Sequence, residues 1–165
     1  MESLSPQNSN HGYQIVPATI HDIFAIDRID KKAFKQWPGD SWGLKYLVTE
    51  LSRRDLRVTV AREGFGNQEV IGFMVCDQAA VLKVAVGQPR RGIGRALLME
   101  WVQAVNPVNI GTMIRHKNEA STGLFGSCGF RLTSGFLSNK VSQTWGWWVI
   151  NGPTSPVLIP RPPSA

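Results

Sequence analysis

A basic, glycine-containing turn lies between two strongly patterned segments in the middle of the chain. Residues 81–86 (VLKVAV) form an apolar run that is typical of a buried strand. Residues 93–105 carry apolar side chains at helical spacing, so the turn at residues 87–92 (GQPRRG) leads from a strand into a helix. The N–H groups of a first helical turn lack intrahelical partners, and glycine lets a ligand approach them closely. With arginines beside it, this turn predicts a site for a phosphate-bearing ligand.

Two common phosphate-binding turns do not fit the spacing. A dinucleotide-binding turn needs a third glycine after Gly92 and Gly94, and Leu97 follows them instead. A P-loop needs Gly-Lys followed by Ser or Thr, and the chain has no such sequence. An ordinary strand-to-helix turn with an exposed basic tip is the alternative to a ligand site.

Two motifs in order carry a family resemblance. Residues 90–98 (RRGIGRALL) resemble the acetyl-CoA pyrophosphate loop of the GCN5-related N-acetyltransferases (GNATs), which has Arg/Gln-x-x-Gly-x-Gly/Ala at the start of a helix. Residues 118–130 (NEASTGLFGSCGF) resemble the family's Asn-x-x-Ala-x-x-Leu-Tyr-x-x-x-Gly-Phe segment. A weaker likeness within residues 29–42 is to the subgroup that acetylates protein N-termini, including the ribosomal-protein alanine acetyltransferases. The resemblance extends over about residues 13–150.

The resemblance implies a mixed α/β fold, the GNAT acyl-CoA N-acyltransferase fold. Its central sheet is mostly antiparallel, contains a splayed strand pair and is flanked by helices. The residue pattern alone gives the order β-α-α-β-β-β-α-β-α-β-β, which agrees with that fold. Ser41 is expected to cap the second helix. The helix after the glycine turn is expected to bury Ile93, Leu97, Trp101 and Ala104.

The resemblance also implies roles for individual residues, with acetyl-CoA as co-substrate. The backbone of the strand before the turn would pair with the pantetheine arm, and the turn would hold the pyrophosphate. Asn118 would contact the arm or a water molecule, and Phe125 would lie beside the thioester sulfur. The residues carried over for the arm are Val84, Ala85 and Val86, and those for the pyrophosphate are Arg90, Arg91, Gly92, Ile93, Gly94, Arg95 and Ala96.

Three positions depart from the family pattern. Pro89 stands at the first position of the pyrophosphate motif and has no N–H to donate. Phe125 stands where many relatives have a tyrosine that is thought to protonate the leaving thiolate. Met113 stands where the alanine-acetyltransferase subgroup has a glutamate base. His116 is therefore the candidate catalytic base, and an ordinary exposed loop histidine is the alternative.

Composition limits the remaining function classes. The net charge of +6 suits a ligand with several phosphates, and no aromatic and basic platform for direct nucleic-acid binding is present. No apolar run is long enough to cross a membrane, and no metal site is indicated. The two cysteines, Cys76 and Cys128, are expected to be free thiols in a cytoplasmic protein. The oligomeric state is open.

The chain is expected to have three parts: a disordered arm at residues 1–12, an acetyltransferase domain at 13–150 and a proline-rich tail at 151–165. The leading hypothesis is an N-acetyltransferase whose amine acceptor is preferably a protein or peptide α-amine. A small-molecule amine acceptor and a CoA-binding protein without catalysis are the alternatives, because the usual Tyr and Glu are absent. A basic binding module with a coincidental glycine turn is the fourth.

Overall fold

The structure is a computed structural model that describes residues 12–64, 68–105, 109–138 and 143–151. The expected N-terminal arm and C-terminal tail, apart from Gly12 and Asn151, lie outside the described residues. Their boundaries therefore stay predictions. The element order matches the predicted one, with two short 3-10 helices, η1 and η2, added.

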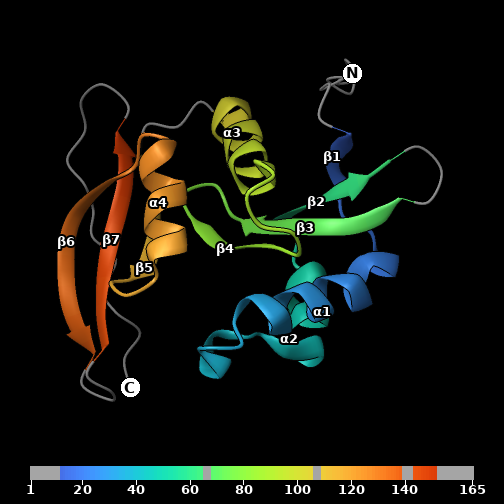
Figure 1. Cartoon of the computed structure of the whole chain (residues 1–165), viewed down its shortest axis with the longest axis horizontal. Helices are drawn as coiled ribbons and strands as arrows, with labels where there is room; N and C mark the ends of the chain where they lie inside the picture. Colours follow the sequence, from blue (N-terminus) through green and yellow to red (C-terminus); the bar gives the residue numbers. More distant parts are fainter. Residues whose placement is uncertain (1–11, 65–67, 106–108, 139–142, 152–165) are drawn as a thin grey trace.

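The strands form two antiparallel sheets (Figure 1). The first has the order β1-β2-β3-β4 and the second the order β5-β7-β6. The strands of the first sheet are β1 (Tyr13–Pro17), β2 (Arg57–Glu63), β3 (Glu69–Cys76) and β4 (Val81–Val86). Those of the second are β5 (Asn109–Arg115), β6 (Arg131–Ser138) and β7 (Gln143–Asn151).

The helices cover both faces of the four-stranded sheet. In Figure 1, α1 and α2 lie below this sheet, α3 lies above it, and α4 stands against the second sheet. The helices are η1 (Ile20–Asp22), α1 (Ile23–Ala33), η2 (Pro38–Asp40), α2 (Gly43–Leu51), α3 (Ile93–Val105) and α4 (Glu119–Ser127). One hydrophobic core lies under α3 and α4, and a second lies between the sheet and α1 with α2.

Two local predictions need correction. Ile93, Leu97 and Trp101 of α3 are buried as expected, but Ala104 is exposed. The helix ends at Val105, so Ala104 lies on its last turn, after the fully buried Trp101. Ser41 does not cap α2, because its hydroxyl donates to the Asp30 carboxylate at 2.7 Å.

The two sheets meet at one end of β4 and β5 and then separate. Ala80 forms an isolated parallel bridge with Gly111, whose N–H donates to Ala79 O at 2.8 Å. The hydroxyl of Thr112 donates to Val81 O at 3.0 Å. We call this contact between residues 79–81 and Gly111 with Thr112 the joint. Beyond the joint the two strands belong to different sheets, which confirms the expected splayed strand pair.

A β-bulge lies at the point of separation. Cys76 of β3 pairs with Val81, but the adjacent Val75 pairs with Lys83, so Leu82 is an extra residue in β4. A bulge bends the strand that contains it and increases its twist. The bulge at Leu82 therefore explains why β4 turns away from β5 directly after the joint.

Candidate functional site

The glycine turn has the expected strand–turn–helix geometry. Gly87 donates to Ile71 O at 2.8 Å, which ends the pairing of β4 with β3. Arg90 and Gly92 both have left-handed backbone conformations, with φ of 64° and 74°. The first α3 hydrogen bond runs from Ala96 N–H to Gly92 O at 2.9 Å. The N–H groups that precede it lie at the positive end of the helix dipole, where an anion binds favourably.

The two glycines of the turn have different surroundings. A Cβ at Gly92 would meet nothing closer than the Tyr13 hydroxyl oxygen at 4.0 Å, so this backbone is open to a ligand. A Cβ at Gly94 would lie 3.2 Å from Cδ2 of Leu124, which is tighter than ordinary contact. Gly94 therefore lets α3 pack closely against α4, a role that the motif did not predict.

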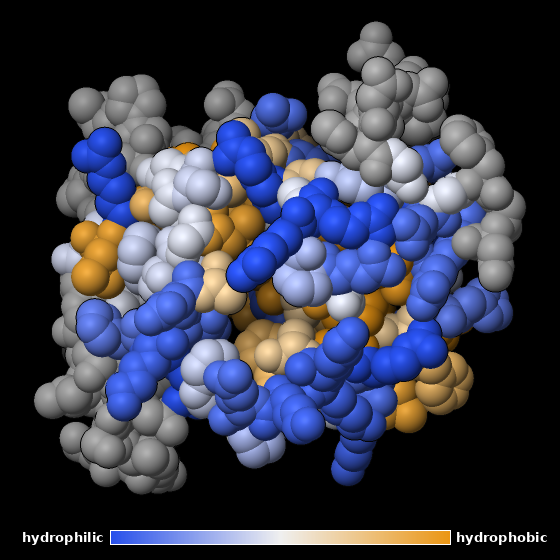
Figure 2. All heavy atoms as spheres, in the orientation of Figure 1, coloured by the Kyte–Doolittle hydropathy of each residue, from blue (hydrophilic) through white to orange (hydrophobic). Residues whose placement is uncertain are grey.

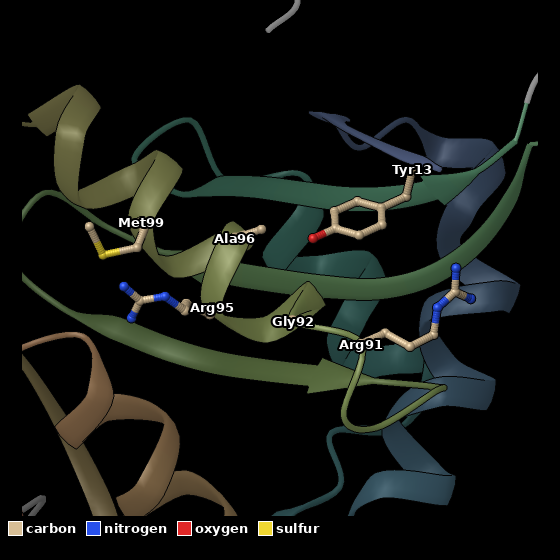
Figure 3. Close-up of a pocket in the computed structure, with 6 residues that line it drawn as sticks. All are labelled: Tyr13, Arg91, Gly92, Arg95, Ala96 and Met99. Atoms are coloured by element: carbon tan, nitrogen blue, oxygen red, sulfur yellow. The ribbon is translucent and has the colours of Figure 1, made fainter. Parts of the chain in front are cut away.

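The arginines of the turn point in different directions (Figure 3). Arg91 forms an ion pair with Glu63 at 2.6 Å and also donates to the side chain of Gln88. Arg95 donates to Ser127 O at 2.7 Å, at the last turn of α4. Arg90 is exposed. Ion pairs at a protein surface contribute little stability, so Arg91 can exchange Glu63 for a phosphate at a small cost in free energy.

A pocket of about 290 Å³ adjoins this turn on the side of β1 (Figure 3). It is lined by Tyr13, Arg91, Gly92, Arg95, Ala96 and Met99. Four of these were predicted to hold a pyrophosphate. Tyr13 was not, because nothing in the sequence relates the first strand to a turn almost eighty residues later.

The predicted pantetheine strand has an open edge beyond the joint. Val84 and Val86 pack against the core under α3, and Ala85 is buried in the core on the α1 side. Within the residues that the structure describes, β4 pairs with β3 along one edge, and its other edge has no strand partner after the joint. Backbone groups along that edge are suited to pair with an extended amide-containing ligand.

Asn118 and Phe125 both lie on α4, where the structure gives them packing roles. Asn118 is the N-cap, and its Oδ1 accepts from Ser121 N–H at 3.1 Å. Phe125 is buried and meets the ring of Phe130 edge-on, with 5.1 Å between the ring centroids. Neither contact tests a role toward a cofactor, and both roles stay predictions.

The candidate base His116 lies in the exposed turn between β5 and α4. Met113, at the position of the subgroup's glutamate, lies on β5 and is 45% exposed. His116 directly follows the last residue of β5, and its imidazole has no hydrogen-bond or ion-pair partner among the described residues. Its catalytic role stays a prediction.

A buried ion pair beside the joint was missed by sequence reasoning. Nζ of Lys83 lies 2.6 Å from Oδ1 of Asp30, and the two side chains are 4% and 0% exposed. Nζ also donates to Asp40 O at 2.5 Å and lies over the rings of Phe34 and Trp42, 4.3 and 4.7 Å from their centroids. Burial lowers the pKa of Lys83, while the hydrogen bond to Asp30 opposes that shift. The signal in the sequence was a single lysine in an otherwise apolar strand.

A second ion pair connects η2 to β5. The guanidinium of Arg115 binds both carboxylate oxygens of Asp40, and both side chains are largely buried. Asp30 also accepts from Ser41 Oγ and Trp42 N–H, each at 2.7 Å. The segment from η2 to Trp42 is thereby held against both splayed strands. Figure 2 shows a hollow near the centre of the molecule in that view, with hydrophobic atoms at its floor and hydrophilic groups around it.

The cysteines are buried, and Asp77 has a structural role. Both cysteines are free and buried, and burial raises the pKa of Cys76 to about 12, so its thiol stays protonated at neutral pH. Asp77 accepts from the N–H groups of Ala79 and Ala80, each at 2.7 Å, and so caps the β3–β4 turn. No helix in the described part of the chain is long and apolar enough to cross a membrane.

Solved structures with the same architecture are numerous. No protein-family model and no curated protein sequence matches the chain. The ribosomal-protein-S18-alanine N-acetyltransferase of Escherichia coli superposes with a TM-score of 0.69 at 16% identity, over 89% of this chain and 99% of that one.

Two further structures were solved with ligands. The Salmonella typhimurium putative acetyltransferase YncA, with its cofactor acetyl-CoA, gives a TM-score of 0.67 at 19% identity, over 90% of this chain and 99% of that one. Arabidopsis thaliana NAA60, in complex with a bisubstrate analogue, gives 0.67 at 15% identity, over 84% and 98%. The likeness thus extends over nearly the whole length of each of these acetyltransferases. The chain therefore has the fold of the GNAT acetyltransferases, as its two motifs predicted.

Proposed function

We propose that the protein is an acetyl-CoA-dependent N-acetyltransferase whose preferred acceptor is the α-amine of a protein or peptide. The observation that carries this proposal is the combination of an open glycine turn at the start of α3 with an open β4 edge leading to the joint with β5. A ligand with a pyrophosphate and an extended amide arm fits both features. Similar folds bind acetyl-CoA, as in the YncA complex.

The residues at the turn fit a pyrophosphate. Backbone N–H groups of Ile93, Gly94 and Arg95 would hold the phosphate oxygens, and Gly92 leaves the space that they need. Arg90 and Arg91 would supply positive charge from the exposed side of the turn. Backbone groups of Val84, Ala85 and Val86 would pair with the amides of the arm, and Asn118 and Phe125 would border it from α4.

When bound, acetyl-CoA supplies an acyl group that is activated as a thioester. The chain must then provide a neutral amine, a donor for the developing oxyanion and a route for one proton. The β4 backbone at Val86 would donate an N–H, and His116 would accept the proton, directly or through water. Phe125 cannot donate a proton, so the thiolate would leave without help from this residue.

An α-amine suits a site without a carboxylate base. An α-amino group has a pKa of about 7.7–8.0, whereas a lysine side chain has one of about 10.4. A substantial fraction of α-amine is therefore already neutral near pH 7.5, while a lysine amine is neutral in about one molecule in a thousand. The methionine at position 113 thus supports an acceptor that needs little assistance to lose its proton.

CoA or acetyl-CoA should raise the melting temperature. A ligand that binds the folded state at one hundred times its Kd adds about 2.7 kcal/mol to the free energy of unfolding. For a domain of this size that corresponds to several degrees, measured by differential scanning fluorimetry. Adenosine without phosphates is the control. No shift at millimolar CoA would exclude both the enzyme and the non-catalytic CoA-binding alternative.

Turnover separates those two alternatives. Thiol release from acetyl-CoA in the presence of an unblocked peptide would establish transfer, and an N-acetylated peptide is the matched control acceptor. CoA binding without thiol release over a panel of peptides and small amines would favour a CoA-binding protein, consistent with phenylalanine at position 125 and methionine at position 113.

Replacing His116 by alanine should slow transfer by about 10²-fold near pH 7.5, the usual contribution of a general base. The rates of wild-type protein and variant are compared with one acceptor at one pH. His21, also exposed, is the control for alanine replacement. An unchanged rate in the His116 variant would remove His116 as the base.

A further inference from the structure

The side from which an amine must approach follows from how the cores are arranged. Ile110 and Ile114 of β5 are buried in the core under α3 and α4, so that face of the splayed strands is covered. Side chains alternate along a strand, so Met113 and Arg115 lie on the other face. Arg115 confirms this by binding Asp40 of η2. The described residues leave this face, on the side of η2, as the one from which an acceptor can reach the splayed strands.

Two carboxylates that approach β4 and β5 on this face are already paired. They are those of Asp30 and Asp40, which pair with Lys83 and Arg115. A polycationic acceptor needs unpaired carboxylates, since each buried positive charge is costly without a partner. Neither of these two is available to it, and the cations that pair with them lie beside the same strands.

Exposed apolar side chains lie beside the joint. Met113 is 45% exposed on β5, and Leu82, the extra residue of the bulge in β4, is 41% exposed. Each is two residues beyond the bridged pair Ala80 and Gly111, at the point where the strands separate. These side chains would lose contact with water if an apolar side chain of the acceptor packed between its amine and the joint.

We propose that the acceptor is an unblocked peptide N-terminus whose first side chain is apolar and uncharged, with Met113 contacting that side chain. The proposal rests on the function proposed above and specifies its substrate. In the transfer, the amine nitrogen bonds to the acyl carbon, the C–S bond breaks, and one amine proton ends on the departing sulfur. The Asp40–Arg115 pair excludes polyamines and peptides that begin with Lys, because it leaves no carboxylate for their second charge.

The test compares kcat/KM for otherwise identical peptides that begin with Leu, Ala, Lys or Glu, and for spermidine. Wild-type protein should prefer the Leu peptide by about tenfold or more over the Lys peptide and spermidine. Met113→Ala should reduce the preference for Leu over Ala by about threefold. Arg115→Ala should expose the Asp40 carboxylate and raise the ratio of spermidine to Leu-peptide turnover by about threefold to tenfold.

The double variant D40N/R115A is the matched control, because it lacks the same ion pair but leaves no unpaired carboxylate. It should return the ratio to the wild-type value. Equal or faster wild-type turnover of spermidine, the Lys peptide or the Glu peptide would overturn the proposal while leaving the acetyltransferase function intact. The same ratio in Arg115→Ala and the double variant would also overturn it. Absence of thiol release with every acceptor would instead contradict the proposed function.

Discussion

Replacing Lys83 by methionine is expected to lower the free energy of unfolding by about 3–5 kcal/mol, the usual cost of breaking a buried ion pair from one side. The substitution preserves much of the side-chain volume between the rings of Phe34 and Trp42. It leaves the Asp30 carboxylate, which is 0% exposed, without its cation. Hydrogen bonds from Ser41 and Trp42 alone must then stabilise the buried charge. Urea unfolding monitored by tryptophan fluorescence measures the loss.

The double variant D30N/K83M tests the reason for that loss. Asparagine keeps an oxygen that accepts from Ser41 and Trp42 but carries no charge, so at least half of the lost stability should return. Lys31→Met is the surface control, because the Lys31–Asp27 pair at 2.7 Å is exposed on the lysine side. It should cost about 0.5 kcal/mol or less. Equal losses in Lys83→Met and the double variant would show that packing, not charge, governs this cluster.

Replacing Gly92 by valine is expected to weaken CoA binding by at least about tenfold, equivalent to about 1.4 kcal/mol. A β-branched residue at a φ of 74° is strained, and its side chain would occupy the open space above the first turn of α3. Isothermal titration with CoA measures the effect. The acceptor KM should change less than the affinity for CoA. The reason is that the proposed acceptor face, which carries Met113 and Arg115, lies on the side of η2, whereas this turn leads into α3 on the other side of the sheet.

Gly43→Val separates strain from loss of the site. Gly43 has a φ of 66°, and a Cβ there would meet no atom within 4 Å, so the backbone penalty is matched. It is the first residue of α2, which lies on the other side of the four-stranded sheet from α3 (Figure 1). Both variants should lose similar stability, and Gly92→Val alone should lose affinity for CoA. A similar loss of affinity in both would remove the glycine turn as the cofactor site.

Local pattern predicted most of the secondary structure. Residues 109–115 were expected to form a strand, and β5 has those bounds. The strand–turn–helix at residues 81–105 was also confirmed, because a short apolar run, a glycine turn and a helical stripe are all encoded by near neighbours. Ser41 was predicted wrongly as a cap because a buried carboxylate eleven residues away, that of Asp30, binds its hydroxyl instead.

The ion pairs of the proposed acceptor face could not be predicted from the sequence, because they join distant parts of the chain. Asp40 meets Arg115 across 75 residues and Lys83 across 43. No periodicity or spacing relates such residues; only the packing of α1 and η2 against two different sheets does. The directions of Arg91 and Arg95 were equally unpredictable, since each is set by one distant partner, Glu63 or Ser127. The cofactor contacts and the role of His116 stay predictions.

The separation of the two sheets also has a consequence for local stability. Each sheet is built from one continuous stretch of chain, before and after α3, and their backbone pairing in the described residues is at the joint between Ala79 and Gly111. Continuous stretches of this kind are natural cooperative units in native-state hydrogen exchange. A molecule seated in the splay would contact both units, so its binding would suppress their independent opening. Ligand occupancy and the slow exchange of amides near the joint would then report the same event.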